Sequence, residues 1–236
     1  MKRKTLILST LAITLTLFLV GGWFVSQQSS PSIVPMANTD VADLPAAVVQ
    51  NVDKVEDVLV RAYSPIMGPK DAPVTIVEFF DPACEACRAF YPILKQIMAE
   101  FPNDVRVVVR YTPFHGEASE LAISILEVAR LQNLFIPVKE ALLDNQEVWA
   151  SHGAPDTSKI MAIAAGAGLD LEKTATQIKS PSIVGVLNQD RADVKTVGIK
   201  QTPTFFVNGE PLVQFGAKEL LAQVRIEVEK ARKVSE

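Results

Sequence analysis

The only two cysteines of the chain stand three residues apart, in the sequence Cys84-Glu85-Ala86-Cys87. They follow a β-branched apolar stretch and begin a stretch with helical periodicity. Residues three apart share one face of a helix, so the two sulfurs are placed to form a disulfide without unfolding a turn. Free N–H groups and the dipole at the start of a helix stabilise a thiolate. The pattern therefore predicts thiol–disulfide exchange, with Cys84 as the low-pKa nucleophile and Cys87 as the resolving thiol.

Two other interpretations of this pair stay open on the residues alone: a buried pair of inert thiols, and a site for a soft metal ion. A disulfide closing so short a loop adds little stability, which favours a chemical role. Two thiolates fall short of the four ligands of a structural zinc site, but they suit Cu(I), so a copper-handling protein is the alternative hypothesis. The two histidines, His115 and His152, are interpreted as surface or capping residues. For the leading hypothesis we expect no metal and no organic cofactor.

The N-terminal segment is typical of an export or anchoring signal. Residues 1–4 contain Lys2, Arg3 and Lys4, and the apolar, uncharged run that follows at 5–25 would span about 31 Å as a helix, at ~1.5 Å per residue. We expect a single-pass anchor in the cytoplasmic (inner) membrane, with the rest of the chain on the periplasmic or extracellular side. A cleaved signal peptide followed by secretion is the alternative. Residues 26–52, rich in Ser, Gln and Pro, are interpreted as a linker with a short helix around 43–52.

Composition and charge narrow the class of protein. Hydrophobic residues make up 48% of the chain and charged residues 21%, which suits a packed core. The formal net charge is −4, and without the three basic residues at the N-terminus 20 basic residues face 27 acidic ones. Such a domain lacks the basic surface that binds phosphate backbones, so we expect no nucleic acid partner.

Residues 53–236 are predicted to form one α/β domain. Hydrophobic periodicity predicts strands at 57–62, 74–80, 105–111, 204–207 and 211–215, and helices at 84–100, 182–197 and 217–234. Between 116 and 179 the periodicity is helical throughout, and the segment is too long for a loop, so we expect an all-helical insertion. Asn208-Gly209 suits a two-residue turn between the last two strands.

The residues around the cysteines resemble a known family. Residues 77–87, Val-Glu-Phe-Phe-Asp-Pro-Ala-Cys-Glu-Ala-Cys, are similar to the active-site strand and helix of thioredoxin-fold proteins, and the helical insertion makes the chain most similar to the DsbA-like group. Pro92 falls where the family's active-site helix is kinked. Residues 197–199, Val-Gly-Ile, precede Thr202-Pro203, and a similar segment precedes the cis-proline of the family. The likeness covers about residues 53–233.

The resemblance implies roles for further residues and partners. Glu78 stands six residues before Cys84, where the family keeps a buried acid that helps to move protons during exchange. Thr202 and Pro203 correspond to the segment that faces the disulfide and docks the substrate backbone. The implied fold is thioredoxin-like. The implied partners are cysteine-containing exported proteins and a membrane redox partner that recycles the cysteine pair.

One departure from the family concerns the dipeptide between the cysteines. Strongly oxidising members of the group carry a histidine there, whereas this chain has Glu85-Ala86, with Asp81 close by. Negative charges raise the pKa of a neighbouring thiol, although Arg88 offsets them if it folds back over the site. We therefore expect a Cys84 pKa above that of strong oxidants and a protein less oxidising than a typical DsbA. Oxidase, reductase and isomerase directions share these motifs.

Overall fold

The computed structural model describes residues 58–151 and 154–234. All described residues belong to one compact unit. The predicted membrane segment at 5–25 and the linker at 26–52, with its short helix, lie outside the described residues. Within the described ranges, no helix has both the length and the apolar character needed to cross a membrane.

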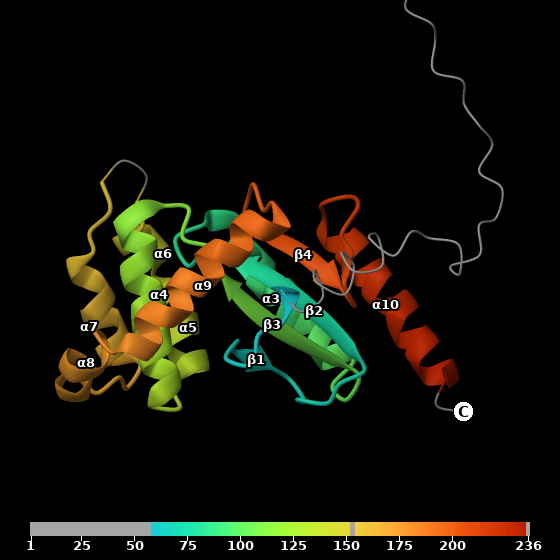
Figure 1. The fold of residues 1–236 in the computed structure, drawn as a ribbon, viewed down its shortest axis with the longest axis horizontal. Helices are drawn as coiled ribbons and strands as arrows, with labels where there is room; N and C mark the ends of the chain where they lie inside the picture. Colours follow the sequence, from blue (N-terminus) through green and yellow to red (C-terminus); the bar gives the residue numbers. More distant parts are fainter. Residues whose placement is uncertain (1–57, 152–153, 235–236) are drawn as a thin grey trace, which may run out of the picture. The chain divides into compact units, whose positions relative to one another are not determined.

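A five-stranded mixed sheet lies at the centre of the domain (Figure 1). Its core is β2 (Val74–Phe80), which pairs in parallel with β3 (Val105–Tyr111) and antiparallel with β4 (Thr204–Val207). Both central strands are rich in β-branched and aromatic residues, which suits strands buried on two faces. The short strands β1 (Ile66–Met67) and β5 (Glu210–Pro211) complete the edges, in the order β1-β3-β2-β4-β5.

Helices cover both faces of the sheet. The helices α3 (Glu85–Glu100) and α10 (Ala217–Val234) pack on one face, and α9 (Pro181–Val197) crosses the other. Successive side chains of a strand point to opposite faces, so Ile76 and Phe80 join the core under α3 while Phe79 joins the core under α9. Glu78, between Ile76 and Phe80 in this alternation, therefore faces α3.

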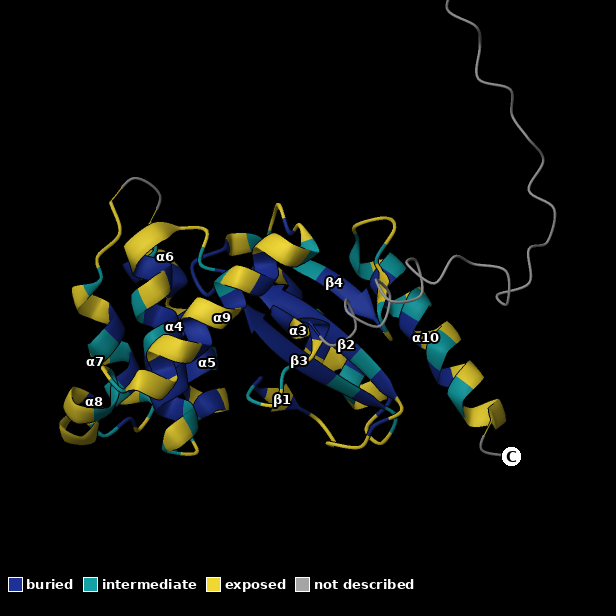
Figure 2. Ribbon diagram, in the orientation of Figure 1, coloured by how far each residue is buried: buried dark blue, intermediate teal, exposed yellow. Residues whose placement is uncertain are grey.

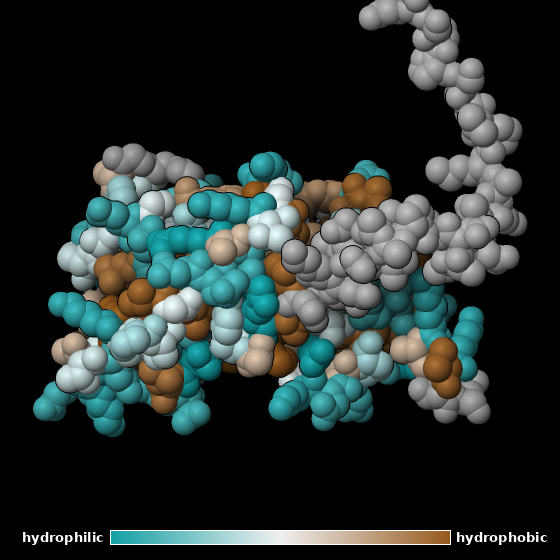
Figure 3. Space-filling model, viewed as in Figure 1, coloured by the Kyte–Doolittle hydropathy of each residue, from teal (hydrophilic) through white to brown (hydrophobic). Residues whose placement is uncertain are grey.

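The predicted insertion is confirmed as wholly helical within the described residues. Its elements are α4 (Gly116–Leu131), α5 (Phe135–Asp144), α6 (Gln146–Trp149), α7 (Ser158–Gly166) and α8 (Leu171–Gln177). These helices lie together beside the sheet, with buried inner sides and exposed outer sides (Figure 2). Their outward faces carry many hydrophilic side chains (Figure 3). The insertion and the sheet share one hydrophobic core, so the insertion is packed against the sheet instead of standing apart from it.

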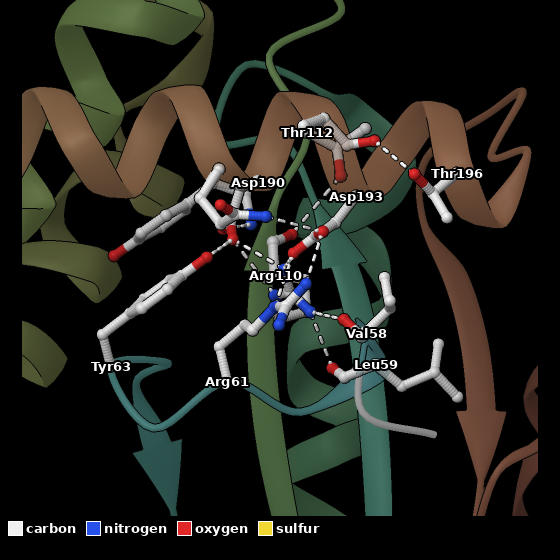
Figure 4. A network of polar contacts seen from close by, with 12 residues as sticks. Val58, Leu59, Arg61, Tyr63, Arg110, Thr112, Asp190, Asp193 and Thr196 are labelled. Carbon is white, nitrogen blue, oxygen red and sulfur yellow. Dashed lines mark hydrogen bonds and ion pairs between the residues drawn. The ribbon is translucent and has the colours of Figure 1, made fainter. Parts of the chain in front are cut away.

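A buried ionic network joins three segments on the α9 face of the sheet (Figure 4). Arg110 of β3 has no exposed side-chain surface and donates to Asp190 of α9 at 2.8 Å and to Asp193 at 2.6 Å. Arg61 adds a two-bond contact to Asp193, and Tyr63 donates to Asp190 at 2.7 Å. The network fastens residues 58–63 and α9 to the sheet.

Two predicted strands differ from the structure. Residues 58–62 form no strand, and residue 57 lies outside the described range. Val58 and Leu59 are helical, and their carbonyl groups accept from the guanidinium of Arg110; the first strand is instead Ile66–Met67.

The last predicted strand, at 211–215, is shorter than expected. Only Glu210–Pro211 pairs with β4, and the chain leaves the sheet after Leu212 N–H donates to Phe205 O. Phe215 then turns to stack on Phe90 of α3, with ring centroids 4.8 Å apart. The predicted turn is confirmed: both Asn208 and Gly209 have positive φ, at 48° and 85°.

Candidate active site

The two cysteines lie at the N-terminal end of α3. Cys84 is the N-cap residue and Cys87 lies within the first turn. Both are free thiols, and Cys84 is 7% exposed whereas Cys87 has no exposed surface. Of the two thiols, Cys84 is therefore the one with exposed surface.

The environment of Cys84 favours its thiolate. A hydrogen bond from the Cys87 thiol is the largest influence; burial opposes it, and further stabilisation comes from the Thr202 side chain and from the backbone N–H groups of Cys87 and Ala86. Together they lower the pKa of Cys84 to about 5. The backbone contribution is the one expected at a helix N-terminus, where N–H groups lack partners within the helix.

The environment of Cys87 has the opposite effect and disfavours its thiolate. Burial, the hydrogen bond to Cys84 and the charge of Glu78 all raise the pKa of the Cys87 thiol well above its ordinary value. The backbone N–H of Asp81 lies 3.5 Å from its sulfur and offsets a small part of this effect. At neutral pH Cys87 is a protonated thiol that needs a base before it attacks a mixed disulfide.

The acidic groups near Cys84 do not act as the sequence predicts. Asp81 is fully buried, and its carboxylate accepts hydrogen bonds from Ala83 N–H, Ser119 Oγ and the N–H of Phe114, and lies 2.7 Å from His115 Nδ1. These contacts tie the Asp81 carboxylate to the loop before α3 and to the start of α4.

The pKa of Cys84 is therefore set by hydrogen bonds and burial, and no acidic side chain is among its largest influences. Glu85 is exposed to solvent, which screens its charge. Arg88 does not fold back over the thiols but pairs with Glu147 of α6 at 2.8 Å. Ala86 does affect Cys84, through its backbone N–H and not through its side chain.

The segment that faces Cys84 carries a cis peptide bond between Thr202 and Pro203, as the resemblance implies. The carbonyl of Thr202 lies 3.2 Å from Cys84 Sγ, and Pro203 is buried. Residues 118 positions apart in the chain thus meet at the reactive sulfur. Pro92 lies inside α3 as expected.

Glu78 is fully buried, and its partner was not predicted from the sequence. Lys139 of α5, also without exposed surface, donates to Glu78 Oε2 at 3.5 Å. Burial raises the pKa of the Glu78 carboxyl, and the ammonium of Lys139 lowers it in part. The sequence held one signal for Lys139: it stands four residues after Phe135 and three before Leu142, on the apolar face of its helix.

The insertion supplies a second residue that sequence reasoning missed. The side-chain amide of Gln146, at the start of α6, donates to Pro82 O at 2.7 Å and to Cys84 O at 3.0 Å. It fixes the loop that carries the nucleophile. No sequence signal marks Gln146, because its partners lie 64 and 62 positions away in the chain.

Within the described ranges, no group of three or more His, Cys, Asp or Glu side chains is arranged to hold a metal ion. His152 lies outside those ranges, and His115 is the N-cap residue of α4, next to Asp81.

Comparison with known proteins places this site in a family. A family model described as thioredoxin matches residues 61–224, well over half of the chain. Disulfide bond formation protein D of Bacillus subtilis strain 168 is 32% identical over 165 residues, which cover 64% of this chain and 70% of that protein. The chain belongs to the DsbA-like thioredoxin-fold family. These similarities support the predicted enzyme class, protein-disulfide oxidoreductase.

Two further similarities extend the comparison. A thioredoxin-like oxidoreductase from Silicibacter pomeroyi DSS-3 superposes with a TM-score of 0.63 at 28% identity, over 75% of this chain and 97% of that one. The Na⁺/H⁺ antiporter NhaA of Herminiimonas arsenicoxydans is 32% identical over 171 residues, which cover 72% of this chain. This chain spans only 25% of the length of that antiporter.

Proposed function

We propose that this DsbA-like chain exchanges disulfides with cysteine-containing exported proteins through Cys84 and Cys87. The observation that carries the proposal is the contrast between the two thiols at one helix N-terminus. Cys84 is partly accessible and lies beside the cis-proline segment with its pKa lowered to about 5, whereas Cys87 is buried with a raised pKa. One thiol is thus built to attack and the other to resolve.

The exchange runs through one mixed disulfide. To reduce a partner, the Cys84 thiolate attacks the partner's disulfide, an intermolecular S–S bond forms, and one partner sulfur leaves as a thiolate. Cys87 then gives up its proton and attacks Cys84 Sγ, which forms the Cys84–Cys87 disulfide and releases the reduced partner. The reverse sequence moves the same two electrons from a partner dithiol to the enzyme. Thr202 and Pro203 dock the partner's backbone, and Glu78 assists proton transfer at Cys87.

We propose that the protein is a weaker oxidant than a typical DsbA. The support is the pKa of Cys84. A value of about 5 lies between roughly 3.5 for DsbA and about 7 for thioredoxin. A more stable thiolate favours the reduced enzyme and makes the disulfide more oxidising. The expected reduction potential therefore lies between about −270 mV and about −120 mV.

The location and the recycling partner are proposed on the sequence and the relatives. The apolar run at 5–25 with its basic flank supports a membrane anchor that places the domain on the periplasmic or extracellular side. The relative from Bacillus subtilis is named for disulfide bond formation, which supports exported substrates and a membrane redox partner for this chain as well. The Cu(I) hypothesis is not favoured by these relatives.

The test is the equilibrium reduction potential of the Cys84–Cys87 pair in glutathione buffers, together with the rate at which the protein oxidises a dithiol peptide. We expect an intermediate potential, and loss of peptide oxidation in Cys84→Ser and in Cys87→Ser. A potential at or above that of DsbA would refute the weaker-oxidant proposal. Peptide oxidation that survives Cys84→Ser would refute the assignment of the site.

A further inference from the structure

The helical insertion places a buried cation against the acid of the redox centre. Lys139 and Glu78 are 0% and 1% exposed at their side chains, and their charged atoms lie 3.5 Å apart. The ammonium also lies over two ring faces, 4.4 Å from the centroid of Phe80 and 4.8 Å from that of Tyr91. A lysine is almost never fully buried unless it is paired, so this position needs an explanation beyond packing.

In this arrangement the Lys139 ammonium contacts one carboxylate oxygen and two aromatic rings. One N–H is directed to Glu78 Oε2, and the two aromatic faces of Phe80 and Tyr91 receive the rest of the charge. The second oxygen of the carboxylate, Glu78 Oε1, is buried and has no hydrogen-bond partner among the described residues. The pair thus leaves one carboxylate oxygen able to accept a proton.

Glu78 lies on the cysteine side of the sheet. Its side chain shares the face of β2 with Ile76 and Phe80, which pack under α3, and its negative charge acts on the buried thiol of Cys87. Arg110, by contrast, belongs to the opposite face, where Asp190 and Asp193 neutralise it. Lys139 is therefore the cation that the described structure directs to Glu78.

We propose that Lys139 is a positioning residue for the resolving step: its ammonium keeps Glu78 in the ionised form that accepts the proton of Cys87. This inference rests on the proposed exchange reaction and deepens it. In that step Cys87 gives its proton to Glu78, a bond forms between Cys87 Sγ and Cys84 Sγ, and the partner sulfur leaves as a thiolate. The lysine acts through Glu78 and does not touch the reacting sulfurs.

Charge balance explains why the lysine is needed. Before proton transfer the carboxylate, the ammonium and the neutral thiol of Cys87 carry no net charge, and after it the neutral acid, the ammonium and the thiolate again carry none. Without the ammonium the same groups carry one negative charge in a low-dielectric interior. Protonation of Glu78 would remove that charge, and with it the base.

Other ionisable groups face this centre and bear on its pH dependence. From α3 these are Cys84, Cys87 and Tyr91, with Lys95 farther out, and from α5 they are Glu140 and Asp144. The Tyr91 hydroxyl donates to Glu140 at 3.1 Å. Burial and the Glu140 carboxylate raise the pKa of Tyr91, so Tyr91 stays neutral from pH 5 to 9. Glu140 in turn pairs with Lys95 at 2.7 Å.

The test isolates the resolving step with a reporter leaving group. Excess Ellman reagent converts Cys84 to its thionitrobenzoate mixed disulfide, and attack by Cys87 then releases a second thionitrobenzoate, which is followed by stopped flow from pH 5 to 9. We expect Lys139→Met to slow the second release about tenfold at pH 7 and to move its pH profile upward, because more of Glu78 is protonated. Lys159→Met, which removes an exposed lysine of α7 in the same insertion, is the matched control and should follow the wild type.

A double-variant comparison separates this role from packing. In a Glu78→Gln background the base is already absent, so adding Lys139→Met should cause no further slowing of the second release. An unchanged rate and profile in Lys139→Met, or equal slowing by Lys139→Met with and without Glu78, would overturn the inference. If Lys139→Met does not fold, Lys139→Gln, which also removes the ammonium but keeps a polar end, takes its place in both backgrounds with the same expected results. Failure of the wild type to release the second thionitrobenzoate would instead refute the proposed exchange reaction.

Discussion

At Cys84 the thiolate is favoured by hydrogen-bond donors and not by a charged side chain. The contributing groups are the Cys87 thiol, the Thr202 side chain and two backbone N–H groups of the first helical turn. Donors of this kind are fixed by the fold, and solvent ions screen them less than they screen exposed charges. The reactivity of Cys84 should therefore depend weakly on salt and strongly on the geometry of the cis-proline segment.

The first residue-scale prediction concerns the hydroxyl of Thr202. The pKa of Cys84, read from the pH dependence of its alkylation by iodoacetamide, should be about 5 in the wild type. Thr202→Val should raise it, because the substitution removes one of the groups that stabilise the thiolate. Thr204→Val is the control, since the Thr204 hydroxyl donates instead to Gln201 O at 2.7 Å. An alkylation profile identical in Thr202→Val and wild type would contradict the assignment.

The second residue-scale prediction concerns Glu85. Its side chain is exposed, and the groups with the largest effects on Cys84 include no carboxylate. Glu85→Gln should shift the Cys84 pKa by less than about half a unit, because solvent weakens the interaction between exposed charges. The same alkylation experiment measures it at low ionic strength. A fall of one unit or more would restore the original expectation that the acidic dipeptide restrains the nucleophile.

At the scale of elements, the sequence predicts the central framework better than the edges. Strands 74–80, 105–111 and 204–207 and the helix at 217–234 have the predicted bounds, because continuous β-branched runs and a clear apolar stripe report on local structure. The strands β1 and β5 have two residues each, and their existence depends on pairing partners that no local pattern reveals. The same limit applies to the site. Glu78 and Pro203 come from motifs, whereas Lys139 and Gln146 reach the cysteines only through the packing of the insertion.

The element-scale prediction tests whether the insertion holds the active-site loop. Gln146→Ala removes the donor shared by the carbonyls of Pro82 and Cys84; Cys84 O keeps the N–H of Arg88 at 3.1 Å, so Pro82 O is the acceptor that loses its donor. Unfolding free energy measured with urea should fall by about 1–3 kcal/mol, the cost of one unsatisfied buried group. Gln96→Ala, on an exposed position of α3, should leave stability within about 0.5 kcal/mol of the wild type. Equal stability of the two variants would show that α6 does not support the loop.

At the scale of the whole domain, the network around Arg110 connects the start of the described chain to the sheet and to the helix that leads to the cis-proline. Two arginines and two aspartates balance in charge, and the tyrosine hydroxyl and backbone carbonyls complete the contacts. Such a cluster is costly to break at one member, because the remaining charges stay buried without their partner. It should therefore set the acid stability of the domain.

The carboxyl of Asp193 makes the stability of the domain depend on pH. Burial raises the pKa of this carboxyl, but hydrogen bonds from Arg61, Arg110 and Gln189 outweigh burial and hold that pKa below its ordinary value. The resulting stability is complete above the unfolded-state pKa, about 3.9, and is lost as pH falls through the lower folded-state pKa. Urea unfolding should thus show a larger loss of stability from pH 7 to pH 3 in the wild type than in Asp193→Asn. Asp71→Asn, at an exposed position, should keep the wild-type difference. If Asp193→Asn loses as much stability on acidification as the wild type, the network is not the acid-sensitive element, and the other buried carboxylates, with Glu127 and its partner Arg130 first among them, become the groups to test.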